Sequence, residues 1–72
     1  MKIENQKNLI ATISKMSDEE KMNLTTLDLS DTQVSDVTPL AGLVNLTTLY
    51  LSNTQVSDVT PLAGLVNLEI YR

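Results

Sequence analysis

Two stretches of the chain, residues 24–30 and 46–52, contain alternating apolar and polar side chains with a period of two. This alternation is typical of a β-strand with one buried face, because successive side chains of a strand point to opposite faces. The pattern therefore predicts two strands, each with two inward-facing leucines. These leucines are Leu27, Leu29, Leu49 and Leu51.

Each predicted strand is followed by a turn-rich stretch, a pair of valines and the sequence T-P-L-A-G-L. A threonine N-cap followed by proline often starts a helical turn, and glycine often ends one. We expect a short 3₁₀ turn with Thr38 as its N-cap and its end near Gly42, and an equivalent turn in residues 60–65. The inward-facing set of the first unit is then Leu24, Leu27, Leu29, Val34, Val37, Leu40 and Leu43.

These elements belong to an internal repeat. Residues 24–45 and 46–67 are identical at 20 of 22 positions, differing only at 28/50 and 31/53, and a third copy begins at residue 68. A fixed period of this length predicts a stacked array in which each strand lies beside its equivalent, so the sheet must be parallel. Either recent duplication or consensus-style engineering accounts for repeats this similar.

The N-terminal segment predicts helices instead. Within residues 3–16, the apolar residues Leu9, Ile10, Ile13 and Met16 are spaced to share one helical face. Residues 17–20 read S-D-E-E, the form of a capping box, so we expect a second short helix that runs to about Met22. This segment is interpreted as a cap over the open core of the first repeat, with a regulatory or partner-binding helix as the alternative.

The motif L-x-x-L-x-L followed by T-Q-V-S-D-V-T-P-L-A-G-L-V-N-L resembles the 22-residue repeat of bacterial internalin-type leucine-rich-repeat proteins, over residues 24–72. The resemblance implies an α/β fold: a short right-handed solenoid with a parallel sheet on the concave face, 3₁₀ turns on the convex face and a helical N-terminal cap. The expected organisation is a cap over residues 1–23, full repeats at 24–45 and 46–67, and the first strand of an incomplete third repeat at 68–72.

Two positions depart from this family's pattern. The family places asparagine after the strand, whereas this chain has Thr32 and Thr54, each of which supplies one hydroxyl rather than a full amide. In the third copy Tyr71 occupies the position of Leu27 and Leu49. If the third copy stacks with the same repeat register, the equivalent residues Asp28, Tyr50 and Arg72 are predicted to lie side by side in a row across the three strands.

The charge distribution excludes several classes of partner. The net charge is −4, and residues 24–67 contain four aspartates but no base. We therefore expect no binding to nucleic acid or to an anionic membrane. No apolar run is long enough to span a membrane. Residues 1–6 carry no apolar signal-peptide region, so we do not expect export of this chain as given, whereas the resemblance suggests a surface or secreted parent protein.

The composition also argues against an enzyme. The chain has no Cys and no His, which removes disulfides, thiolate ligands, and the commonest metal ligand and general base. No nucleophile has a base, no pocket-forming segment is expected, and both glycines lie in L-A-G-L turns rather than in a phosphate loop. We expect no catalytic residue, metal or cofactor.

The resemblance implies protein recognition on the concave face, and both repeat differences fall there. Tyr50 is interpreted as a binding hot spot or as a cross-strand packing residue. Asp28 and Asp31 are interpreted as a solvated acidic face rather than a cation site. Asp36 and Asp58 are interpreted as structural turn residues whose carboxylates accept hydrogen bonds from backbone N–H groups. The candidate partner-binding residues are Thr26, Asp28, Ser30, Asp31, Thr48, Tyr50, Ser52 and Asn53.

The alternative function is self-association of a structural or engineered scaffold without a natural ligand. The last strand leaves an open edge, which recruits another chain. We expect a homodimer through this edge, with head-to-tail stacking, or domain swapping after a slip of one repeat, as the other outcomes. The residues of this self-association edge are Leu65, Val66, Leu68, Ile70 and Tyr71.

Overall fold

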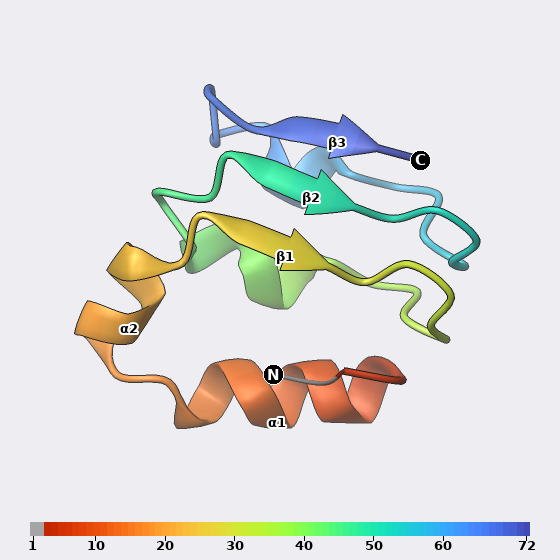
Figure 1. The fold of residues 1–72 in the computed structure, drawn as a ribbon, viewed down its shortest axis with the longest axis horizontal. Helices are drawn as coiled ribbons and strands as arrows, with labels where there is room; N and C mark the ends of the chain where they lie inside the picture. Colours follow the sequence, from red (N-terminus) through yellow and green to blue (C-terminus); the bar gives the residue numbers. More distant parts are fainter. Residues whose placement is uncertain (1–2) are drawn as a thin grey trace.

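The computed structural model describes residues 3–72 and contains two helices, three strands and two 3₁₀ turns. Figure 1 shows the strands side by side in one layer, with α1 below the edge formed by β1. In chain order the elements are α1 (Gln6–Lys15), α2 (Asp18–Asn23), β1 (Thr26–Asp28), η1 (Thr38–Gly42), β2 (Thr48–Tyr50), η2 (Thr60–Leu62) and β3 (Glu69–Tyr71).

The three strands form one parallel sheet in the order β1-β2-β3, as the repeat predicted. β1 and β2 pair with an offset of one full repeat, so that Leu27 lies opposite Leu49. The 3₁₀ turns lie behind the sheet and pack against each other (Figure 1). The inward leucines of the strands and the apolar residues of these turns enclose a single core.

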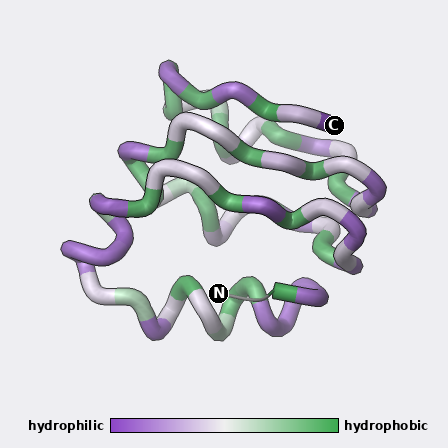
Figure 2. Tube along the Cα trace, in the orientation of Figure 1, coloured by the Kyte–Doolittle hydropathy of each residue, from purple (hydrophilic) through white to green (hydrophobic). Residues whose placement is uncertain are grey.

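Burial of this core declines along the chain. Val34, Val37 and Leu43 are completely buried, whereas their equivalents Val56, Val59 and Leu65 are only partly buried. Helix α1 covers the first repeat on one side and the second repeat covers it on the other. The described element that follows the second repeat is the short strand β3, and the apolar residues near β3 lie at the border of the structure in Figure 2.

Helix α1 contributes a narrower apolar face than its sequence predicted. Leu9 and Ile13 are buried and Met16 packs at the margin of the core, but 51% of the surface of Ile10 is exposed. The prediction for Ile10 is therefore wrong. Leu9 and Ile13 are one turn apart and point the same way, whereas Ile10 is rotated by about 100° from Leu9. Because α1 covers only one edge of the repeat stack, no segment among residues 3–72 covers Ile10 fully.

Helix α2 confirms the predicted capping box. The Ser17 hydroxyl accepts from the Glu20 backbone N–H (3.2 Å), and the Glu20 carboxylate accepts from the Ser17 backbone N–H (3.0 Å). The pKa of Glu20 is lowered, first by the bond that its carboxylate accepts from the Ser17 backbone and then by hydrogen bonding with the Ser17 side chain. The box sets where α2 begins and therefore directs the chain into β1.

The N-terminal segment joins the first repeat as a preceding repeat would. The backbone N–H of Gln33 donates to the Glu4 carbonyl (2.9 Å), just as that of Gln55 donates to the Val34 carbonyl (3.1 Å). The Gln6 side chain adds three bonds: its oxygen accepts from the backbone N–H groups of residues 35 and 36, and its nitrogen donates to the carbonyl of residue 36. These contacts support the cap interpretation; the exact division at residues 23, 45 and 67 stays a prediction.

The turn before each 3₁₀ segment is held by an aspartate, and Thr38 is not its N-cap as predicted. The N-cap position of η1 is Val37, which has no side-chain capping bond. Asp36 Oδ1 instead accepts from the Thr38 backbone N–H (2.9 Å) and hydroxyl (2.6 Å), and Asp58 Oδ1 accepts from the Thr60 backbone N–H (2.9 Å). The side-chain bond to threonine is the main reason that the pKa of each aspartate is lowered.

The register of the third strand differs from the prediction. β3 pairs with β2 so that Leu49 lies opposite Ile70 and Tyr50 opposite Tyr71. The lateral row therefore continues into Tyr71 and not into Arg72. The physical reason is burial: one residue fewer between Leu68 and the strand lets Ile70 take the inward position, whereas the predicted register would have turned a tyrosine into the core.

Candidate functional site

The concave face of the sheet carries the residues that the sequence singled out as partner-binding. Their side chains lie on the outer face of β1 and β2 and in the turns that follow these strands. Ser30 and Thr48 are half-buried, and the others are exposed: Thr26, Asp28, Asp31, Tyr50, Ser52 and Asn53. The structure therefore brings the predicted set together on one side of the molecule.

A stacked pair of tyrosines dominates this face. The ring centroids of Tyr50 and Tyr71 are 5.2 Å apart with an interplanar angle of 23°, and the two residues keep 38% and 47% of their surfaces exposed. The Tyr71 hydroxyl donates to the Glu69 carboxylate (2.8 Å). This bond, followed by the negative charge of Glu69, raises the pKa of Tyr71. The pair is thus a preformed aromatic surface.

The sequence placed Tyr71 only at the self-association edge, and missed its position in the concave row. The spacing of the apolar residues at the start of the third copy already indicated this position. Two residues separate Leu46 from Leu49, but only one separates Leu68 from Ile70. Aligning Ile70 with Leu49, rather than counting repeat positions from Leu68, would have placed Tyr71 beside Tyr50.

The second repeat difference, Asp31 against Asn53, has a structural role. Both residues have φ of 60°, in the left-handed region that Asn and Asp adopt more readily than other non-glycine residues. The Asn53 amide donates to Asp31 Oδ1 (2.8 Å) and so ties the second turn to the first. Thr32 and Thr54 donate instead to carbonyls within their own repeats, those of Leu29 and Leu51.

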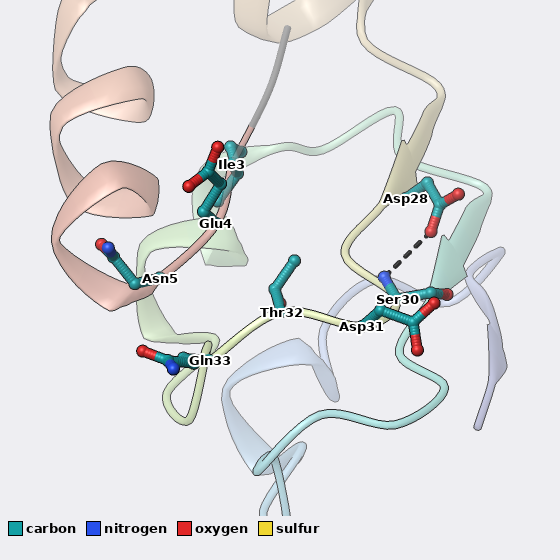
Figure 3. A pocket seen from close by; sticks show the side chains of 8 residues that line it. All are labelled: Ile3, Glu4, Asn5, Asp28, Ser30, Asp31, Thr32 and Gln33. Carbon is teal, nitrogen blue, oxygen red and sulfur yellow. Dashed lines mark hydrogen bonds between the residues drawn. The ribbon is translucent and has the colours of Figure 1, made fainter.

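A pocket of about 550 Å³ lies between the N-terminal segment and the end of β1. Figure 3 shows Asp28 and Asp31 on the β1 side, Glu4 and Asn5 on the N-terminal side, and Thr32 between them. The expectation that no segment forms a pocket is therefore wrong, because docking of the N-terminal segment against the turn after β1 creates one. The lining residues are Ile3, Glu4, Asn5, Asp28, Ser30, Asp31, Thr32 and Gln33.

The pocket is polar and acidic, without a metal-ligating cluster. Asp28 Oδ1 accepts from the Ser30 backbone N–H at 2.9 Å. Over residues 3–72, no group of three or more His, Cys, Asp or Glu side chains is arranged to hold a metal ion. Within the same residues, no helix is both long and apolar enough to cross a membrane.

The predicted self-association edge lies at the far end of the sheet from α1. Leu65, Leu68 and Ile70 are partly buried, whereas Val66 exposes 88% of its surface. In the part of the chain that the structure describes, β3 pairs with β2 alone. Its outer edge therefore presents backbone hydrogen-bonding groups next to incompletely covered apolar side chains.

Comparisons with known proteins agree with this architecture. The family model described as "Leucine Rich repeats (2 copies)" matches residues 23–64. The crystal structure of an internalin (InlF) from Listeria monocytogenes is similar, with a TM-score of 0.65 and 29% sequence identity over 97% of this chain. The match covers 18% of that internalin, so this chain spans less than a fifth of its length. A search of curated proteins finds no match.

Proposed function

Since this chain belongs to the leucine-rich-repeat family and carries the internalin type of repeat, we propose that it binds a protein partner through the concave face of its sheet. Its fold is the predicted α/β solenoid, with a parallel sheet, 3₁₀ turns and helices at the N-terminal end. Folds of this kind are protein-interaction modules and are typically non-enzymatic. The chain is thus a protein-interaction repeat module, and the concave face is the proposed binding surface.

The exposed Tyr50–Tyr71 stack carries this proposal. Tyrosine is enriched among the few residues that supply most of the binding energy at protein interfaces. The two rings hold each other in place before binding, so little side-chain entropy is lost when a partner arrives. Three strands about 4.8 Å apart make a narrow surface, which suits a peptide segment better than a standard interface of about 800 Å² per partner.

The test is selection of a random peptide library, displayed on phage, against the immobilised chain. We expect Tyr50→Ala to weaken binding of the selected peptides by about tenfold or more, because truncating an aromatic hot spot removes its buried contact area. Tyr50→Phe keeps the stack and should retain most of the affinity. Binding is measured by fluorescence anisotropy with synthetic versions of the selected peptides.

The matched control is Val44→Ala, which shortens an exposed apolar side chain in the turn between η1 and β2, outside the concave row. It should leave peptide binding unchanged. Peptides that bind equally well to the parent chain and to Tyr50→Ala, with both proteins folded by circular dichroism, would show that the concave face is not the binding surface.

The second candidate is association of chains through the self-association edge, favoured by the outer side of β3, which pairs with no other described strand, beside partly covered Leu65 and Ile70. Pairing of two such edges about a two-fold axis gives a closed dimer, whereas α1 blocks the opposite end of the stack against head-to-tail addition. The apolar side chains would then be covered by a second copy of the chain.

The mass in solution tests this candidate. Light scattering over a concentration series should approach twice the 7.9 kDa of one chain, and Leu68→Asp should shift the species to the monomer. Val66→Asp is the variant that leaves the core intact, because Val66 is almost fully exposed. Tyr50→Ala should leave the mass unchanged. A parent chain that stays monomeric at every concentration rules out the dimer.

A further inference from the structure

The chemistry of the concave face indicates which kind of partner side chain it fits. In register, Asp28 of β1 lies opposite Tyr50 of β2, and Tyr50 lies opposite Tyr71 of β3. The row therefore places a carboxylate, a ring and a second ring on neighbouring strands, about 4.8 Å apart. Tyr71 stacks on one face of the Tyr50 ring, and β1 with Asp28 is the strand on the other side of β2.

Asp28 has an oxygen available for a partner. Its Oδ1 accepts from the Ser30 backbone N–H, and among residues 3–72 its Oδ2 has no hydrogen-bond partner. At position 28/50, the first of the two differences between the repeats, a charged acceptor on β1 therefore lies opposite an exposed aromatic residue on β2. A carboxylate next to the face of a tyrosine ring is an arrangement that attracts a cation, which interacts with both.

Acidic side chains predominate around this row, and the base next to it in the sequence is Arg72, which directly follows Tyr71. Residues 24–67 contain no Lys or Arg, and the neighbouring carboxylates of Asp31 and Glu69 lie in the turn after β1 and on β3. The pocket that Asp28 and Asp31 border extends this surface toward the N-terminal segment, and its 550 Å³ falls within the range of about 300–1,000 Å³ for small-ligand pockets. A partner that approaches here meets a negative surface with an aromatic centre.

We propose that the concave face binds a protein segment bearing an arginine, whose guanidinium stacks on the free face of Tyr50 and pairs with Asp28. Arginine fits better than lysine, because its planar group stacks on an aromatic ring while its N–H donors reach a carboxylate beside that ring. The inference rests on the proposed concave-face binding and adds the chemistry of the partner to it. The acidic surroundings exclude acidic and phosphorylated segments by like-charge repulsion.

The test uses peptides selected from the same random library. We expect arginine to be enriched among them, and replacement of that arginine by citrulline, its neutral isostere, to weaken binding to the parent chain by about tenfold. The same replacement should have a smaller effect on Asp28→Asn, since the pairing with the carboxylate is already gone and only the contact of the charge with the Tyr50 ring is lost. Asparagine keeps an acceptor oxygen for the Ser30 N–H, so this substitution should leave the turn in place. Glu19→Gln, with the same change in net charge on α2, should leave the citrulline effect intact.

The outcomes separate this inference from the proposed function. Peptides that depend on Tyr50 but show no arginine enrichment, tolerate lysine equally, or are unaffected by citrulline overturn the arginine site and leave concave-face binding standing. Peptides that do not depend on Tyr50 overturn both. An empty selection also counts against both. An effect of citrulline that is equally large on Asp28→Asn overturns the pairing with Asp28.

Discussion

Leu43→Ala is expected to unfold much of the chain, whereas Leu65→Ala, at the same position of the next repeat, is expected to be tolerated. Leu43 is completely buried and Leu65 only partly. Truncating a fully buried leucine costs about 2–5 kcal/mol in free energy of unfolding, and a core of this size rarely supplies more than about 3–5 kcal/mol. Leu65→Ala removes fewer contacts, so we expect a loss of about 1 kcal/mol.

The two substitutions are each other's control, because the residues on either side are identical in the two repeats. Any difference between them must come from what covers the side chain. Urea unfolding followed by circular dichroism gives both free energies, at a protein concentration low enough to exclude self-association. Equal losses for Leu43→Ala and Leu65→Ala would contradict the view that coverage by the next unit, rather than local sequence, sets the contribution of each leucine.

Leu9→Ala is expected to detach the N-terminal helix, while Ile10→Ala is expected to be nearly silent. Leu9 is completely buried in the common core, and half of the surface of Ile10 is exposed. Because α1 packs against η1, loss of Leu9 leaves a cavity between the helix and the first repeat, at a cost of about 3 kcal/mol. Removing the exposed side chain of Ile10 should change the stability by less than about 0.5 kcal/mol.

Hydrogen exchange distinguishes detachment of the helix from general weakening. In Leu9→Ala, the amides of α1 and of residues 33, 35 and 36, which bond to the N-terminal segment, should lose protection more than those of β2. A uniform loss of protection would instead indicate that α1 and the repeats unfold as one unit. A large destabilisation by Ile10→Ala would mean that this side chain is covered in solution, as its spacing in the sequence first indicated.

Most of the fold followed from the repeat. Two copies identical at 20 of 22 positions require equivalent strands side by side, and the inward leucines follow from alternation. The capping box at Ser17 was equally readable because it depends on residues three apart. Predictions of burial were wrong where tertiary packing decided which of several suitably spaced side chains is covered. Ile10 has the spacing of a core residue, but within residues 3–72 the packing of α1 leaves half of the surface of this residue exposed.

The candidate site was half predictable. Comparison of the repeats singled out Tyr50 and Asp28, because a position that differs between near-identical copies stands out against the constant ones. The partner ring, Tyr71, could not be placed by counting from the start of the third copy. Its position depends on which side chain the core accepts, and burial of Ile70 shifts the register by one residue. The pocket beside Asp28 was also unforeseen, since it forms between segments that are distant in the chain.

The sequence by itself determined the period, the parallel sheet, the inward leucines, the acidic concave face and the likeness to internalin repeats. These properties depend on residue identity at fixed spacing, and spacing alone sets which side of a strand a residue occupies. Only the tertiary structure decided the Tyr50–Tyr71 stack, the exposure of Ile10, the pocket beside Asp28 and the uneven burial of identical repeats. Each of these depends on which unit lies next to a residue in space, and two copies of one sequence acquire different surroundings when one lies inside the stack and the other at its edge.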